Sequence, residues 1–298
     1  MIAILGATGQ VGGKIADILK QKSSEKVRLI ARSADDLRRV VGRQAEAMVG
    51  DALDTQFLVK AFQDVDALFA LIPPQRRSDD FLTYADAVGN SIARAAEIVR
   101  LPFVVNLSSV GAELVKGTGP IVGLHNQEER LNRITGLNVL HLRAGYFMEN
   151  LLTSIALIKS SGINGSAIRG DVKIPMIAAQ DIAEFAAERL AKRDFSGSSI
   201  GYLLGWGDIS LNEATMTIGI KIGQPNLRYV AFSYVEAERR LVNAGLSKDV
   251  SRRYIEMSRA FNEGRISAPR SAESCTGTTF SEFCDTVFVP IYMRKAAA

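Results

Sequence analysis

A glycine-rich segment near the start of the chain has the residue types that bind a phosphate group. Residues 6–13 read GATGQVGG, and they lie between the apolar run Ile2–Leu5 and a segment of helical pattern, Lys14–Leu19. Glycines allow a tight turn and close approach of the backbone to a pyrophosphate, and the first N–H groups of the following helix attract an anion. The order of strand, glycine turn and helix therefore predicts a dinucleotide-binding site. The residues expected to contact the dinucleotide are Gly6, Thr8, Gly9, Gln10, Val11 and Gly12.

The residue that follows the second apolar run indicates which dinucleotide is bound. About twenty residues after the last glycine of such a motif, a site for NAD has an acidic residue. This chain has Arg32 there, directly after the run Val27–Ala31. A guanidinium binds a 2′-phosphate through paired charge-assisted hydrogen bonds, whereas a carboxylate would repel it. We therefore expect NADP(H) to be preferred, with NAD(H) as the alternative cofactor. A second interpretation, in which Arg32 is an ordinary solvated residue at the start of a loop, stays open.

Residues that follow two further apolar stretches are expected to border the cofactor. Asp51 and Ala52 come after a short apolar stretch, and we expect them to lie beside the adenine. Pro73 and Pro74 come after the run Ala67–Ile72, and we expect them to shape a loop over the phosphates. Ligands of open α/β sheets bind outside the carboxyl ends of the strands, which is where both segments would lie.

The apolar runs that carry these residues alternate with longer segments of helical period. Five runs have the length of strands: Ile2–Leu5, Val27–Ala31, Ala67–Ile72, Phe103–Leu107 and Val139–Leu142. Between residues 81 and 99, apolar residues recur at steps of three and four, which predicts a helix that ends before Pro102. The alternation predicts βαβ units and a parallel sheet that is buried on both faces. The expected fold class is α/β, with a Rossmann-type doubly wound parallel sheet.

The pattern changes after Asn150. Helix starts outside the βαβ rhythm are predicted at Ser210 and Ser233, each followed by a glutamate three residues later in capping-box form, and at Ser247. We expect residues 1–150 to form the NADP(H)-binding Rossmann domain, completed by parts of 170–207. Residues 151–298 are expected to form a smaller, mainly helical domain that closes over the cofactor and contacts the substrate.

Composition and charge argue against several classes of protein. The 298 residues carry a formal net charge of +4, but the basic residues occur as scattered pairs and not as a stripe with interleaved aromatic residues. We therefore expect a small-molecule substrate and no direct binding of nucleic acid. The longest apolar runs are far shorter than the roughly 18 residues of a membrane span, so no membrane contact is expected. The first residues are expected to form a core strand and not a signal peptide, and an oligomer is left open.

The cysteines and histidines indicate neither a disulfide framework nor a metal site. Cys275 and Cys284 lack C-x-x-C spacing, so we expect both to be small buried hydrophobic residues in a reducing compartment, and we expect a cytoplasmic location. The chain has two histidines, and His141 lies inside the run Val139–Leu142. A zinc site of three histidines is therefore not available, and no metal is expected.

Several motifs together resemble the NmrA-like family of atypical short-chain dehydrogenases. The glycine spacing G-x-x-G-x-x-G is typical of that superfamily, and the resemblance extends over nearly the whole chain. The segment Phe232–Gly245 looks most like the quinone oxidoreductase and triphenylmethane reductase branch. Beyond that segment, the resemblance is carried by Gly6–Gly13, Arg32, Gly50-Asp51, Leu71-Ile72-Pro73, Asn106-Leu107-Ser108-Ser109, His125 with Glu129, Leu142-Arg143, Met148-Glu149-Asn150 and Pro175–Ile182.

The resemblance implies a Rossmann domain with a small substrate lid. It implies further cofactor contacts from Leu71, Ile72, Pro73 and Asn106, and it implies a nicotinamide that lies near Ser108, His125 and Phe147. A serine nucleophile would need an elbow turn that the segment around Ser108 lacks. We therefore assign Ser108 to polar contact with cofactor or substrate.

One segment departs from the pattern of a typical short-chain dehydrogenase. Tyr-x-x-x-Lys is expected after the serine strand, but residues 125–129 read HNQEE, so the usual proton donor is absent. On a helix, His125 and Glu129 would share one face, and the carboxylate would orient the imidazole and favour its protonated form. Three interpretations of His125 stay open: a surface histidine, a contact with nicotinamide or substrate, and a general acid.

The sequence thus supports two hypotheses of different classes. The first is an NADPH-dependent reductase that transfers hydride to a small conjugated electrophile such as a quinone. A quinone delocalises the incoming charge onto an oxygen that water can protonate, so a strong enzymatic acid is less necessary. The second hypothesis is a non-catalytic regulatory protein that senses NADP(H).

Overall fold

A parallel sheet forms the larger part of the protein. The computed structural model describes residues 1–23, 25–40 and 45–294, and within them a seven-stranded sheet has the order β10-β6-β5-β4-β1-β2-β3. Every neighbouring pair of these strands is parallel. The strands are β1 (Ile2–Leu5), β2 (Val27–Ala31), β3 (Ala45–Val49), β4 (Ala67–Ala70), β5 (Phe103–Ser109), β6 (Asn138–Ala144) and β10 (Ser198–Leu203). This is the Rossmann-type α/β fold that the alternating pattern predicted.

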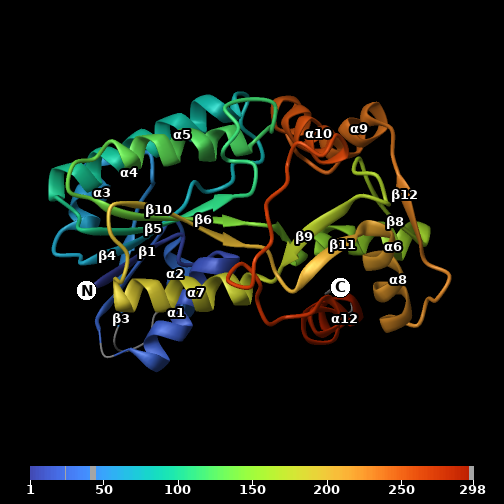
Figure 1. Cartoon of the computed structure of the whole chain (residues 1–298), viewed down its shortest axis with the longest axis horizontal. Coiled ribbons are helices and arrows are strands. Elements are labelled where there is room, and N and C mark those ends of the chain that lie inside the picture. The colour runs from blue at the N-terminus through green and yellow to red at the C-terminus, as the bar shows by residue number, and fades with distance from the viewer. Residues whose placement is uncertain (24, 41–44, 295–298) are drawn as a thin grey trace.

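Helices cover both faces of this sheet, as Figure 1 shows. On one face lie α1 and α7, which pack against each other, and on the other lie α3, α4 and α5. Each face has its own core of buried aliphatic and aromatic side chains, because a parallel strand is covered on both sides. The helices are α1 (Gln10–Lys22), α2 (Ala34–Val40), α3 (Thr55–Phe62), α4 (Phe81–Val99), α5 (Ile121–Asn132) and α7 (Ala179–Lys192).

The remaining elements lie beyond the carboxyl ends of the parallel strands (Figure 1). In the described part of the chain they include two small sheets, of order β11-β9-β7 and β12-β8. The strands are β7 (Tyr146–Phe147), β8 (Ile163–Ser166), β9 (Lys173–Ile177), β11 (Gly207–Ser210) and β12 (Arg228–Ala231). The helices are η1 (Met148–Ser154), α6 (Ile155–Ser161), α8 (Leu211–Lys221), α9 (Tyr234–Asn243), α10 (Lys248–Asn262), α11 (Phe280–Phe283), η2 (Cys284–Phe288) and α12 (Val289–Met293).

Local signals set several element boundaries. The helix predicted over residues 81–99 is confirmed as α4, and Ser210, Ser233 and Ser247 cap α8, α9 and α10 through their hydroxyl oxygens. The run Ala67–Ile72 ends as a strand at Ala70, two residues early. Proline restricts the residue before it and lacks an N–H for the ladder, so the chain leaves the sheet ahead of Pro73.

Two further expectations are answered by the structure. Cys284 is buried as expected, but Cys275 is exposed, and its thiol donates to the Ser271 carbonyl at 3.2 Å. The expectation for Cys275 was wrong because its segment passes over the surface and reaches no core.

Across the described residues, none of the helices is both long and apolar enough to cross a membrane. The last four residues of the expected second domain lie outside the described residues.

Candidate functional site

The glycine turn presents its backbone to solvent at the carboxyl end of β1. Gly6 has a φ of 73°, a left-handed conformation that favours glycine, and Gly9 is the N-cap residue of α1. In the described residues no side chain caps α1, and its first turn has no acidic residue. Thr8, Gly9 and Gln10 are exposed. The N–H groups at this helix start are therefore available to an anionic ligand.

Gly12 is needed for packing, whereas Gly9 is not. A Cβ at Gly12 would lie 2.3 Å from the Gly6 carbonyl oxygen, so only glycine lets α1 pack against the turn. A Cβ at Gly9 would lie 3.2 Å from the same oxygen, a tight contact that small shifts can relieve. Gly9 therefore leaves room above the backbone, whereas Gly12 joins helix and strand.

Arg32, Asp51 and Tyr84 gather where the adenosine end of a dinucleotide is expected. Arg32 directly follows β2, is exposed, and has no ion pair among the residues that the structure describes. The Gly50 N–H donates to the Ala31 carbonyl at 3.1 Å, which places the segments of Arg32 and Asp51 side by side. Burial raises the pKa of Tyr84, the Arg32 guanidinium opposes this rise, and Asp51 adds to it. Asp51 also accepts a hydrogen bond from the Leu53 N–H at 3.0 Å. The sequence reasoning missed Tyr84, because it stood only as one position of an apolar helical stripe.

The loop after β4 contacts the glycine turn. A Cβ at Gly6 would lie 3.0 Å from a methyl carbon of Leu71, and Leu71, Ile72 and Pro73 are half-buried. Phe147, in β7, is also half-buried and packs against the core on the α1 and α7 face of the large sheet. These residues border the carboxyl edge of the sheet, where the resemblance implied cofactor contacts, and their contact with a cofactor stays a prediction.

A small, mainly apolar cavity lies beside that loop. Its volume is about 160 Å³, and it is formed by the loop after β4, the starts of α4 and α5, and the N-terminal half of α10. Ile72, Phe81 and Leu124 are among its apolar lining residues, and Arg76 and Tyr254 are among its polar ones. A cavity of this character can hold a small flat molecule with few polar atoms.

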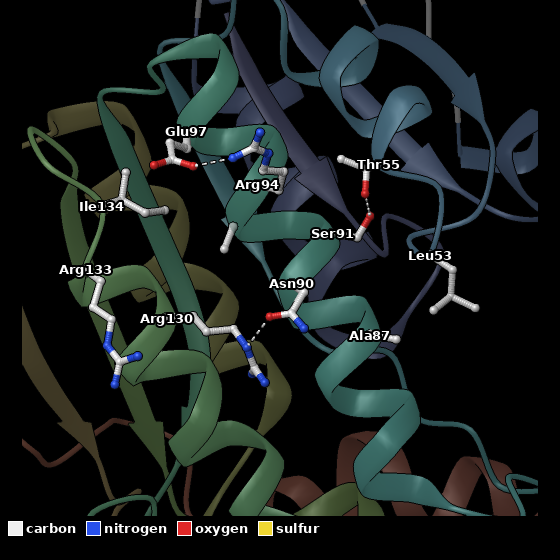
Figure 2. Close-up of a pocket in the computed structure, with 11 residues that line it drawn as sticks. Leu53, Thr55, Ala87, Asn90, Ser91, Arg94, Glu97, Arg130, Arg133 and Ile134 are labelled. Atoms are coloured by element: carbon white, nitrogen blue, oxygen red, sulfur yellow. Dashed lines mark hydrogen bonds and ion pairs between the residues drawn. The ribbon is translucent and has the colours of Figure 1, made fainter.

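A larger groove of about 510 Å³ lies between α4 and α5 (Figure 2). About half of its lining is polar, and several of its polar side chains bond to one another. The Thr55 and Ser91 hydroxyls lie 2.9 Å apart, Arg130 donates to Asn90 at 2.8 Å, and Arg94 donates to Glu97 at 3.4 Å. No residue of the loop after β4, which contacts the glycine turn, lines this groove, whereas several residues of that loop line the smaller cavity. We therefore take the smaller cavity as the candidate substrate site.

Ser108 belongs to a buried ionic network and not to an open pocket. Its hydroxyl donates to Glu128 Oε1 at 2.5 Å, and Arg143 donates to both oxygens of Glu128, at 3.1 and 2.7 Å. All three residues are less than a tenth exposed. Arg143 also donates to Tyr202 Oη at 3.0 Å and to Glu113 Oε2 at 3.3 Å. Because the Ser108 hydroxyl is already bonded to Glu128, its expected contact with substrate is not visible in this arrangement.

Asn106 and His141 form a second buried pair behind this network. The Asn106 amide lies 3.1 Å from His141 Nδ1, and the other ring nitrogen of His141 lies 2.9 Å from the side-chain oxygen of Asn132. Burial lowers the pKa of His141 to about 4, with Glu128 acting in the opposite direction. His141 therefore stays neutral near pH 7 and serves as a structural residue. The side-chain oxygen of Asn106 is buried without a partner among the described residues.

The expected pair of His125 and Glu129 does not form. Both residues lie on α5, but His125 Nδ1 lies 2.8 Å from the Ala112 carbonyl, and the exposed Glu129 lies 3.8 Å from Arg133. A carbonyl can only accept, so Nδ1 carries the proton and Nε2 is the nitrogen left for other contacts. The carboxylate that α5 buries is Glu128, because that position and not 129 faces the sheet. The sequence signal for this was the register of α5, in which Glu128 and Leu131 share the buried side.

Among the described residues, no group of three or more histidine, cysteine, aspartate or glutamate side chains lies close enough together to hold a metal ion. The candidate site consists of the glycine turn, Arg32 after β2 and the mainly apolar cavity, all at the carboxyl edge of the sheet.

Comparisons with known proteins extend this description. Residues 6–193 match the model of a family described as NAD(P)H-binding. An NADPH-dependent quinone oxidoreductase of Escherichia coli, solved with NADPH, is 22% identical with a TM-score of 0.82, over 97% of this chain and 100% of that chain. The Citrobacter sp. triphenylmethane reductase, solved with NADP(H), is 19% identical with a TM-score of 0.81, over 96% of this chain and 99% of that chain. No curated protein sequence matches.

Proposed function

The chain belongs to the NAD(P)H-binding family, and from that premise we propose that it is an NADPH-dependent reductase that transfers hydride to a small conjugated acceptor such as a quinone. The observation that carries the proposal is the apolar cavity of about 160 Å³ at the carboxyl edge of the sheet that bears the glycine turn. Open α/β sheets bind their ligands at that edge. The likeness in fold to an NADPH-dependent quinone oxidoreductase and to a triphenylmethane reductase agrees with it.

The chemistry of the acceptor fits the absence of the usual tyrosine and lysine pair. Bound NADPH supplies a hydride, and the resulting charge on a quinone spreads over the ring to an oxygen. An isolated ketone would concentrate that charge and would need a strong acid beside it. The segment 125–129 supplies no tyrosine and lysine pair, so the cavity suits an acceptor that stabilises its own charge.

Steady-state consumption of NADPH with a panel of quinones, simple carbonyl compounds and cationic dyes tests the proposal. We expect turnover with the quinones, slower turnover with the dyes and none with simple ketones. Tight NADPH binding without turnover of any acceptor would contradict the proposal and favour the NADP(H)-sensing regulator. We propose that residues 1–150 together with α7 and β10 hold the cofactor, and that the elements beyond the strand ends contact the acceptor.

Arg32 is expected to set the preference for NADPH. It can meet the 2′-phosphate with charged hydrogen bonds, whose worth of about 1.5–3 kcal/mol corresponds to roughly ten- to a hundred-fold in affinity. Titration of the wild-type protein with NADPH and NADH should show this margin, and Arg32→Ala should remove it. Arg38→Ala changes an exposed arginine that pairs with Asp35 in α2, and it serves as the control. Equal affinities of the wild-type protein for the two cofactors would refute this role of Arg32.

His125 is expected to shape the site without serving as its acid. Its Nδ1 proton is held by the Ala112 carbonyl, and His125 is not among the residues that line the cavity. His125→Ala should therefore act mainly on KM and lower the hydride-transfer rate by less than the roughly hundred-fold that removal of a general acid causes. Single-turnover rates of hydride transfer, measured across pH in both proteins, distinguish a general acid from a residue that only shapes the site. A wild-type rate that falls through a pKa near neutrality, with no such fall in His125→Ala, would make His125 the acid.

A further inference from the structure

Three polar side chains, Gln75, Arg76 and Tyr254, line the mainly apolar cavity, and the last two can carry or oppose a charge. Arg76 comes from the loop after β4, and Tyr254 comes from the second turn of α10. Most of the remaining lining is apolar and includes Ile72, Phe81 and Leu124. A guanidinium and a phenol beside apolar walls form a place for one oxygen of a ligand whose remaining surface is apolar.

Backbone contacts join the two segments that carry these side chains. The Ser247 N–H donates to the Arg76 carbonyl at 2.9 Å, which joins the loop after β4 directly to the start of α10. The Ser247 hydroxyl accepts from the Val250 N–H at 3.1 Å and so caps the helix. Val250 and Tyr254 lie one turn apart on α10, and both line the cavity. The N-cap residue of α10, the helix that carries Tyr254, is therefore bonded directly to the backbone of Arg76.

Asp249 adds an attachment between the start of α10 and the start of α4. Its carboxylate accepts from the Phe81 N–H at 2.9 Å and from Arg253 Nε at 3.3 Å. A Cβ at Gly119 would lie 2.0 Å from the Arg253 carbonyl oxygen, so α10 also packs closely on the loop before α5. These contacts make the wall of the cavity a preformed part of the fold.

The polar ends of Arg76 and Tyr254 are left for a ligand. Within the described residues, Arg76 has no ion pair, and the Tyr254 hydroxyl has no hydrogen bond to another side chain or to the backbone. Tyr254 and Arg76 line the same cavity, and both keep a solvent-exposed part. Partial burial raises the pKa of Tyr254 and the Arg76 cation opposes that rise, so the phenol is protonated near pH 7. A phenol beside a cation can both donate a proton and bear the charge that remains.

We propose that Tyr254 and Arg76 are the oxyanion-binding pair of this cavity, in which Tyr254 gives its proton to the acceptor oxygen and Arg76 neutralises the charge on that oxygen. The inference rests on the proposed function. Hydride adds to a ring carbon of the quinone, and the π electrons move through the conjugated system to a carbonyl oxygen. After that oxygen is protonated, the ring carbon releases one proton to solvent and the second carbonyl oxygen gains one, which completes the hydroquinone. The Tyr254 O–H bond breaks as the new O–H bond of the hydroquinone forms, and solvent then reprotonates the phenolate. The sum is NADPH, quinone and one proton to NADP⁺ and hydroquinone.

Binding of para-nitrophenol to the protein saturated with NADP⁺ tests the pair without any turnover. The ligand is a flat ring with one ionisable oxygen, and its absorbance reports whether that oxygen is charged. We expect the wild-type protein to bind the phenolate form preferentially. Arg76→Leu should weaken phenolate binding by at least about tenfold, the effect of losing a charged hydrogen bond. Tyr254→Phe should also weaken it, while Arg77→Leu and Tyr292→Phe, which change residues outside the cavity lining, should not.

Turnover of a naphthoquinone supplies the second measurement. Tyr254→Phe should lower kcat by roughly ten- to a hundred-fold, in line with loss of a donor to a developing oxyanion, and should remove the solvent isotope effect on kcat. Its NADPH affinity should equal that of the wild-type protein. Phenolate binding that is absent in the wild-type protein, or equal in all variants, would overturn the inference. A wild-type protein that binds the phenolate through both residues but reduces no acceptor would refute the proposed reductase and leave the oxyanion pair standing.

Discussion

Valine at position 9 is expected to abolish NADPH binding while the protein stays folded. Gly9 is exposed at the N-cap of α1, with a φ of −83° and a ψ of 175°, a conformation that valine adopts readily. Its branched side chain would fill the space in which the pyrophosphate must approach the backbone N–H groups. We expect a loss of more than about hundred-fold in affinity, which corresponds to roughly 2.7 kcal/mol. Calorimetric titration with NADPH and the circular dichroism spectrum measure the two properties separately.

Two other glycines of the turn serve as matched controls. A Cβ at Gly13 would lie 3.4 Å from the Ala7 carbonyl oxygen, an ordinary contact, so Gly13→Ala should keep its NADPH affinity and gain up to about 1 kcal/mol of helix stability. Gly12→Ala should destabilise the fold itself, because its Cβ would lie 2.3 Å from the Gly6 carbonyl oxygen. Normal binding of NADPH by Gly9→Val would mean that the phosphates bind at another place.

Methionine at position 143 is expected to lower the free energy of unfolding by about 3–5 kcal/mol, since it leaves a buried carboxylate without its partner. Arg143 is 7% exposed and Glu128 is 4% exposed, and two hydrogen bonds join them. Among the described side chains, the Ser108 hydroxyl would be the remaining hydrogen-bond donor to the carboxylate. Urea denaturation followed by circular dichroism measures the change.

The double variant Arg143→Met with Glu128→Met separates the cost of the lost pair from the cost of the unpaired charge. Replacing both charges by apolar residues should recover most of the loss, because a buried ion pair itself contributes little net stability. Arg133→Met removes an exposed pair with Glu129 at 3.8 Å and should cost less than about 1 kcal/mol. Equal free energies of unfolding for Arg143→Met and Arg133→Met would contradict the prediction, because Glu128 would then not depend on Arg143 for its stabilisation.

The sequence by itself determined the features that depend on neighbours along the chain. The apolar runs and glycine turn are local, so β1 and the start of α1 could be predicted from residues 2–13, and α4 from its apolar spacing. The serine caps of α8, α9 and α10 are contacts over three residues and were equally visible. The cation after β2 followed from the same local order.

Only the tertiary structure decided which side chains meet across the fold. Glu129 was expected to pair with His125 one turn away on α5, but His125 contacts the Ala112 carbonyl and Glu129 lies near Arg133. The partner of Glu128 is fifteen residues away on β6, and nothing near Glu128 in the sequence marks Arg143 as that partner. Arg76 and Tyr254 are separated by most of the chain and are joined through Ser247, a cap whose backbone N–H reaches the loop after β4. Such contacts depend on how whole elements pack. A buried polar group needs a hydrogen-bond partner, and that partner can come from any part of the chain that the fold brings next to it.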